Sequence, residues 1–297
     1  MSARWVDLLD PDRGELVAAL PRGVDPDVVE LLADPSDGIH ARPLLEAHGP
    51  YVLGRFLDAR PEAESIVYRD VYVVATPDLV VTVRKSPEVG PPWEPSALDV
   101  VAPDTLSAGE LFHRLVDDVA ESFFDVVDAT DDQIAELEEH IDDWPTEQVR
   151  RRLIELRHEL HRARRTASAT RAALRRILDK RLDVGADSLF PEQVERLFAE
   201  PYETIVRASE ELDGARDVLA TLRDHHQARI AEAQNDVVKK LTVIASLVLV
   251  PSLIVGYYGQ NFESAFDDAF WSIGVSSSLI VVTTLVQLAI YRWRRWI

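Results

Sequence analysis

Two uncharged apolar stretches near the end of the chain decide its architecture. Residues 241–258 read LTVIASLVLVPSLIVGYY, and residues 270–291 read FWSIGVSSSLIVVTTLVQLAIY. A helix that spans a membrane needs about 20 predominantly apolar residues, with a range of roughly 17 to 25. Both stretches meet that requirement, and they lie at the wrong end of the chain for a signal peptide. Each is predicted to be a transmembrane helix; two buried helices of a soluble core are the alternative.

The charges beside these stretches predict the orientation of the chain. Lys239 and Lys240 precede the first stretch, and three arginines occur in the basic tail, residues 292–297. The linker between the spans, residues 259–269, contains acidic residues but no Lys or Arg. Because Lys and Arg favour the cytoplasmic side, both termini are predicted to be cytoplasmic and the linker external. The expected location is the cell inner (plasma) membrane.

The chain as a whole is acidic and contains no cysteine. It has 52 Asp and Glu against 32 Lys and Arg, which gives a formal net charge of −20. Such a chain suits metal cations and is a poor nucleic-acid binder, since phosphate backbones need a basic surface. The lack of Cys excludes disulfide scaffolds, Cys-ligated zinc and thiol catalysis. With no nucleophile–base arrangement and no glycine loop for phosphate, the protein is not expected to be an enzyme.

The N-terminal part of the chain predicts a sheet domain. Residues 51–57, 65–75 and 79–84 are rich in Val and Tyr and are separated by turn residues. This pattern is typical of strands in one sheet. We therefore expect a cytoplasmic α/β sheet domain over residues 1–105.

Long helices follow the predicted sheet. Ser107, with Glu110 three residues later, forms a plausible capping box at the start of the helical pattern. A helical hairpin is predicted over residues 106–188, followed by a stalk helix over residues 189–240 that continues into the first span. The fold class is an α+β cytoplasmic domain with a long stalk helix and two C-terminal transmembrane helices.

The two arms of the predicted hairpin carry opposite charges. The arm that ends near Trp144 is acidic, whereas residues 150–165 of the returning arm read RRRLIELRHELHRARR. No aromatic residues interleave these arginines, so base stacking with nucleic acid is not favoured. The basic arm is expected to pack on the acidic arm of its own chain or to meet acidic residues of a neighbouring chain.

One face of the first span suits the lining of an ion path. Two helices cannot enclose a water-filled path, so a chain that moves ions must oligomerise around one of them. At helical spacing this face is small or mildly polar toward the outer end and apolar toward the inner end. Its residues are Asn235, Val238, Leu241, Thr242, Ala245, Leu249, Ser252 and Gly256. Small residues also let helices pack closely, so a plain helix–helix contact is the alternative.

A short motif at the outer end of the first span connects these features to a known family. Residues 250–262 read VPSLIVGYYGQNF, directly before the acidic linker and the second span. Together with DLVVTVRKS at residues 78–86, the helical stretch 107–141 and the terminal RWRRWI, this pattern resembles the CorA family of divalent-cation (magnesium) transporters. The family motif at this place is YGMNF, and Gln260 departs from it by replacing Met.

The resemblance implies a funnel-shaped homopentamer with an external selectivity filter at Gly259, Gln260 and Asn261. A ring of neutral amide and backbone oxygens can hold a hydrated Mg²⁺, which gives up its water reluctantly, without binding it too tightly to release it. Gln260 either faces the pore or ties the motif to a neighbouring subunit. The acidic residues of the external loop would gather cations at the mouth, and a solvated loop is the alternative. They are Glu263, Asp267 and Asp268.

The resemblance also implies regulation by divalent ions bound between subunits. Glu200 of the predicted stalk aligns with one such acidic position when counted back from the motif, and Glu203 lies on the next turn. Bound ions would screen repulsion and hold a closed state, so falling cytosolic magnesium would open the path. An ordinary solvated helix face is the alternative for these carboxylates.

The predicted function is therefore a divalent-cation channel for magnesium uptake, gated by cytosolic divalent ions. The membrane potential supplies about 4.6 kcal/mol per 100 mV for a divalent ion. Mg²⁺ is expected as substrate and regulator, with Co²⁺, Ni²⁺ and Zn²⁺ as further candidate ions. The expected partners are these ions, the lipid bilayer and further copies of the chain, with no nucleic acid. The alternatives are a zinc transporter of the same superfamily and a non-conducting membrane scaffold or ion sensor.

Overall fold

The computed structural model of the chain groups it into two units, residues 1–222 and 223–297. The residues that the structure describes are 2–35, 42–62, 65–95, 105–182, 189–259 and 269–296.

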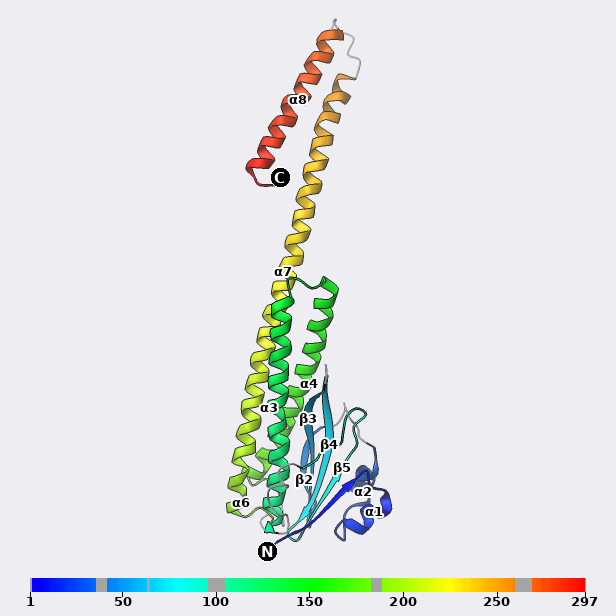
Figure 1. The fold of residues 1–297 in the computed structure, drawn as a ribbon, viewed down its shortest axis with the longest axis vertical. Helices are drawn as coiled ribbons and strands as arrows, with labels where there is room; N and C mark the ends of the chain where they lie inside the picture. The colour runs from blue at the N-terminus through cyan, green and yellow to red at the C-terminus, as the bar shows by residue number, and fades with distance from the viewer. Residues whose placement is uncertain are drawn as a thin grey trace. The chain divides into compact units, whose positions relative to one another are not determined.

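A five-stranded sheet with the order β1-β5-β4-β3-β2 lies in the first unit (Figure 1). Its strands are β1 (Arg4–Leu9), β2 (Leu44–Ala47), β3 (Val52–Glu62), β4 (Ser65–Thr76) and β5 (Leu79–Arg84). β1 pairs with β5 in parallel, and the other neighbours are antiparallel. The three strands predicted from the sequence correspond to β3, β4 and β5, whereas β1 and β2 were not predicted.

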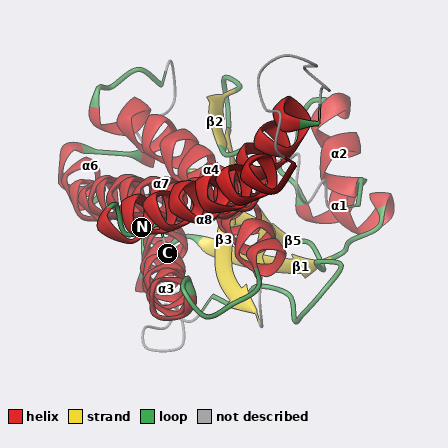
Figure 2. Ribbon diagram, turned by 90° about the horizontal axis from the view of Figure 1, so that it is seen from above, coloured by secondary structure: helices red, strands yellow, loops and turns green. Residues whose placement is uncertain are grey.

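Both faces of the sheet are buried, which agrees with the nearly apolar runs at residues 71–75 of β4 and 79–83 of β5. Helices α1 (Arg13–Ala19) and α2 (Pro26–Ala33) enclose one core with side chains such as Leu32 and Val81. The other face packs against α3 (Ala108–His140). Figures 1 and 2 show α1 and α2 on one side of the sheet and the long helices on the other.

An aromatic cluster joins α3 to the sheet and to the start of the stalk. The ring of Phe112 is fully buried, and its centroid lies 6.0 Å from Phe56 on β3. The centroids of Phe190 and Phe198 lie 5.5 and 6.2 Å away on another side. Edge and tilted contacts of this kind add to the stabilisation from burial, so Phe112 is a central packing residue of the first unit.

Helices α3 and α4 (Thr146–Leu178) form the predicted hairpin. The capping box at the start of α3 is confirmed: the Glu110 N–H donates to the Ser107 hydroxyl oxygen, and the Ser107 N–H donates to the Glu110 carboxylate at 2.8 Å. α4 begins after Pro145, which needs no N–H at that position. An ion pair of 2.7 Å between Arg164 and Asp213 links α4 to the stalk.

The stalk is interrupted near its start, whereas the sequence predicted one stalk helix over residues 189–240. The structure has a short α6 (Glu192–Leu197) and then α7 (Ala199–Tyr258), with Phe198 between them. Pro201 explains the interruption. In a continuous helix its ring would clash with the carbonyl of Leu197, and it has no N–H to donate the backbone hydrogen bond to that carbonyl. From Ala199 onward, α7 runs through the stalk and the first predicted span without interruption.

The second unit contains the membrane-spanning part of α7 and helix α8 (Ala269–Trp293). Both helices contain windows with a mean hydropathy of 2.0, of which 11% and 0% is buried. A soluble core helix is mostly buried, so this exposure favours helices that face lipid. The Ser246 hydroxyl and the Tyr291 hydroxyl lie 2.6 Å apart and join α7 to α8.

Candidate functional site

The residues of the predicted ion-path stripe are exposed on the surface of α7 in the single chain. All eight of its residues, from Asn235 to Gly256, are exposed within the chain, and Leu241 and Leu249 remain 64% and 66% exposed. The side of α7 that is buried instead carries Val243 and Ile254. At about 100° per residue, these two side chains lie roughly opposite the stripe. Most of the circumference of this part of α7 is open in the single chain, with Ile244, Val248 and Leu253 62%, 63% and 69% exposed, and the face chosen from the sequence is one part of it.

The hydroxyl groups of the stripe are bonded within their own helix. The Thr242 hydroxyl donates to the Val238 carbonyl at 2.8 Å, and the Ser252 hydroxyl donates to the Val248 carbonyl at 2.7 Å. Their oxygen lone pairs remain available as acceptors. A cation or its water could therefore approach these oxygens without breaking the helix.

A shallow, largely apolar cavity of about 460 Å³ lies along the middle of the stripe. Four of the predicted residues line it, together with two neighbours on the same helix. The lining residues are Leu241, Thr242, Ala245, Ser246, Leu249 and Val250. A narrow path bounded by such side chains from several copies could close by losing its water.

Of the three predicted filter residues, only Gly259 is among the residues that the structure describes. The Gly259 N–H donates to the Val255 carbonyl at 2.8 Å, so Gly259 completes the last turn of α7 directly above the stripe. The remaining predicted filter and loop residues lie outside the described residues. They are Gln260, Asn261, Glu263, Asp267 and Asp268.

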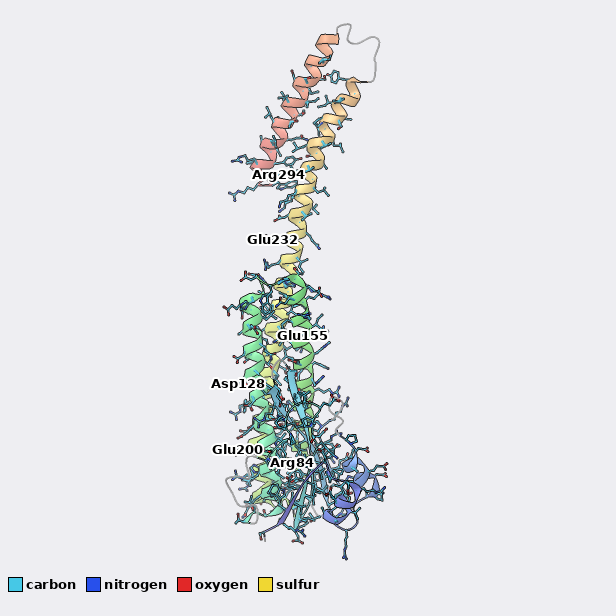
Figure 3. All side chains as sticks on the ribbon, turned by 45° about the vertical axis from the view of Figure 1, so that its right-hand side comes forward. Arg84, Asp128, Glu155, Glu200, Glu232 and Arg294 are labelled. Carbon is cyan, nitrogen blue, oxygen red and sulfur yellow. The ribbon has the colours of Figure 1, made fainter. Side chains whose placement is uncertain are left out.

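Glu200 lies near acidic residues of α3, at the start of α7 (Figure 3). Burial first, and then the charge of Glu200, raises the pKa of Asp117. Burial, followed by Asp117, Asp118 and Glu200, raises the pKa of Glu121. These shifts show carboxylates that repel one another across the α3–α7 contact.

The sequence had indicated Glu203, rather than Asp117 and Glu121, as the companion of Glu200. Glu203 is exposed on α7. Asp117 and Glu121 are four residues apart, which places them on one face of α3; this spacing was the available signal. Among the described residues, no three His, Asp or Glu side chains come together in a way that could hold a metal ion.

A second charged cluster is buried between the sheet and α3. Asp58 on β3 is completely buried, and its two carboxylate oxygens lie 3.3 Å from Arg60 Nε and 3.5 Å from Arg69 Nη1. Arg60 also contacts Asp125 of α3, so the cluster links the two elements. Burial raises the pKa of Asp58 to about 6, even though both arginines oppose the shift.

The raised pKa of Asp58 gives the first prediction. Its folded pKa of about 6 exceeds the reference value of 3.8, so the folded state binds more protons between these values and stability falls as pH rises through that range. The contribution is up to about 3 kcal/mol. Denaturant unfolding of the full chain at pH 5 and pH 7 measures the upper part of this change, about 1.3 kcal/mol. Asp58→Asn is expected to remove this part of the pH dependence; an unchanged dependence in the variant would contradict the assignment.

The fold and the site define a class of membrane protein: an α/β domain, a helical hairpin and a stalk helix that becomes the first of two C-terminal spans. A family model described as "CorA-like Mg2+ transporter protein" matches residues 2–295. The chain belongs to this family. The resemblance noted in the sequence is thereby confirmed, and the description of the family as transporters agrees with the expectation that the protein is not an enzyme.

Individual relatives agree with this assignment. The chain is 24% identical over 191 residues to the cobalt/magnesium transport protein CorA of Thermotoga maritima, covering 64% of this chain and 53% of that protein. The chain thus spans about half the length of the curated relatives that it matches.

Solved structures confirm the predicted fold. The CorA magnesium transporter of Methanocaldococcus jannaschii is 19% identical and has a TM-score of 0.77, with 99% of this chain and 91% of that chain covered. The cytoplasmic domain of ZntB from Vibrio parahaemolyticus is 14% identical and has a TM-score of 0.59, covering 78% and 89%. At these identities the likeness concerns the fold alone.

Proposed function

We propose that the chain forms a divalent-cation channel that takes up Mg²⁺, driven by the membrane potential. The observation that carries this proposal is the exposed stripe of α7, which is opposite the side buried in the second unit and ends about one turn before Gly259. Several copies arranged around this stripe would enclose a path, which one copy cannot do. A homopentamer with both termini in the cytoplasm is the proposed assembly.

The proposed path has an inner apolar section and an outer polar filter. Leu241 and Leu249 would form the section that closes by dewetting. Gly259, Gln260 and Asn261 would offer backbone and amide oxygens to the water shell of the ion. Mg²⁺ keeps several of its waters in protein sites, so a filter that holds the hydrated ion permits both entry and release.

Ion flux into proteoliposomes tests the proposal. The purified full chain is reconstituted into vesicles that contain a magnesium-sensitive or a zinc-sensitive dye, with an inside-negative potential and low internal magnesium. Entry of Mg²⁺ that grows with the potential is expected. Entry of Zn²⁺ without Mg²⁺ would assign the chain to the zinc alternative. No entry of either ion by a verified oligomer would support the non-conducting scaffold or sensor.

The acidic cluster is proposed as part of the regulatory site. Glu200 and Glu203 on α7, or Asp117 and Glu121 on α3, would supply one or two ligands of a divalent-ion site that lies between copies. The repulsion that raises the pKa of Asp117 and Glu121 would be relieved by a bound cation, which is how the ion would stabilise a closed arrangement. A neighbouring copy would supply the remaining ligands, because no three carboxylates converge among the described residues of one chain.

Glu200→Ala is expected to weaken inhibition by internal magnesium. The concentration that halves flux should rise roughly tenfold, within the usual range of coupling between sites. Glu210→Ala, which removes an exposed carboxylate farther along α7, is the matched control and should leave inhibition unchanged. The same magnesium response in Glu200→Ala and in the unaltered chain would rule out this role.

A further inference from the structure

The exposed side of α3 carries a row of carboxylates without ion pairs. Asp128, Asp132, Glu136 and Glu139 are spaced by three or four residues, lie on one side of the helix and are exposed; Figure 3 labels Asp128 midway along α3. We call this row the acidic face. Burial and then the nearby Asp128 and Asp132 raise the pKa of Asp131. Among the described residues, no cation pairs with a carboxylate of this face, so its negative charge is uncompensated.

The exposed side of α4 carries three arginines that, among the described residues, likewise form no ion pair. Arg157, Arg165 and Arg171 are exposed, and in the part of the chain that the structure describes none of them forms an ion pair. We call these three residues the basic face. Ile154 lies one turn before Arg157 and is 40% exposed. The basic face therefore combines positive charge with an apolar contact.

The hairpin does not neutralise its own charges. α3 contains eleven Asp and Glu and a single Arg, whereas α4 contains ten Arg and three Glu. Over the described ranges no ion pair joins these two helices. They share an apolar core instead, with side chains such as Leu137 of α3 and Leu156 of α4 buried in it. The basic arm thus packs on the acidic arm of its own chain, as expected, but through apolar side chains rather than through ion pairs.

We propose that the acidic face of one copy packs against the basic face of the next copy around the ring. This inference rests on the proposed assembly of several copies. The faces are of similar length, about 17 Å and about 21 Å at 1.5 Å per residue. Two different faces that meet head to tail generate a closed ring when the rotation between copies closes. Opposite charges at such a contact set the register and exclude wrong pairings.

Both faces belong to the same chain, and this favours a second copy over a lipid surface as the partner. An anionic membrane would account for the basic face but would repel the acidic face, whose charge equally needs a counterpart. A neighbouring copy satisfies both faces at once. Each copy then contributes one acidic and one basic face, so every charge row in the ring is paired.

Charge reversal tests the contact in the full chain. One variant carries Asp128→Arg, Asp132→Arg and Glu136→Arg, and the second carries Arg157→Glu, Arg165→Glu and Arg171→Glu. Either variant places like charges opposite each other, and the concentration at which half of the protein is assembled should rise roughly tenfold. Native mass spectrometry in detergent at low salt measures assembly. Combining both sets in one chain restores opposite charges and should restore assembly.

Cross-linking gives an independent measurement, because the natural chain has no cysteine. Asp132→Cys and Arg165→Cys are introduced into separate, differently tagged chains that are expressed together. A short bifunctional thiol reagent should link the two tagged chains. A pair consisting of Asp132→Cys and Glu30→Cys, which lies on α2 of the first unit, is the control and should give no comparable product.

The possible results separate this inference from the proposed channel. If both reversal variants stay folded by circular dichroism and assemble as the unaltered chain does, the proposed contact between copies is refuted. The proposed channel function is not affected by that result. Failure of the combined variant to recover assembly would also refute the proposed contact. So would a basic-face variant that loses binding to anionic vesicles but assembles normally. If the unaltered chain neither assembles nor conducts, the proposed function itself falls, and the contact falls with it.

Discussion

Replacing Asn261 with alanine is expected to abolish Mg²⁺ entry while the assembled oligomer remains intact. In the proposed filter the amide oxygen of each copy accepts hydrogen bonds from the water shell of the ion, next to the described end of α7 at Gly259. A hydrogen bond to a charged partner contributes about 1.5–3 kcal/mol, so the loss is tenfold or more even for one contact. The measurement is dye-reported flux into proteoliposomes, with the oligomer verified by native mass spectrometry.

A second amide provides the control for this experiment. Gln227→Ala removes an exposed side-chain amide on α7, far from the motif in sequence, and flux should be unchanged. Loss of assembly in Asn261→Ala, rather than loss of flux alone, would show that the motif is structural. Full flux through an intact Asn261→Ala oligomer would remove Asn261 from the filter.

Phe112→Ala is expected to cause the largest loss of stability in the first unit. The ring is fully buried and contacts three other phenylalanines, on β3 and beside the stalk. Truncation of a buried Phe costs about 3–5 kcal/mol, because apolar burial is lost and a cavity remains. Denaturant unfolding of the full chain, followed by far-UV circular dichroism, reports the change.

Phe124 on the same helix is the matched comparison. It is only partly buried, and its ring lies 5.6 Å from the guanidinium carbon of Arg207. Phe124→Ala should therefore cost clearly less than Phe112→Ala. Equal losses in the two variants would mean that the aromatic cluster around Phe112 is not the centre of this core.

The parts of the fold that could be predicted from the sequence are those with long or chemically explicit signals. The two spans follow from uncharged length alone, and the start of α3 follows from the pairing of Ser107 with Glu110. β4 and β5 are rich in Val because both of their faces are buried. These features depend on neighbouring residues, which a single sequence displays directly.

The parts that were missed depend on distant contacts. β1 has charged residues at Arg4 and Asp7 and forms because the distant β5 pairs with it. β2 has only four residues, too few to show a strand pattern of its own, and pairs with the neighbouring β3. The break before α7 follows from Pro201, which is visible in the sequence but was not weighed when one stalk helix was predicted over residues 189–240. The approach of Glu200 to Asp117 depends on how α3 packs beside the stalk.

For the candidate site, the sequence allowed a prediction of the stripe on α7 but not of the ion that passes along it. The stripe on α7 could be chosen by helical spacing, since one face is small and mildly polar, and the structure leaves that face exposed. The ion that passes along it could not be predicted, because Gly-Gln-Asn offers only neutral oxygens and these suit more than one hydrated cation. That question belongs to the flux experiment.

The internally bonded hydroxyls of the stripe bear on how the protein enters its membrane. Since Thr242 and Ser252 already donate to carbonyls of their own helix, a newly inserted copy meets the lipid tails without an unsatisfied hydroxyl donor. Insertion and association can then proceed as separate stages. A bilayer that holds only scattered copies is expected to stay sealed to ions, and leakage during biogenesis is avoided because water enters only after the copies have met.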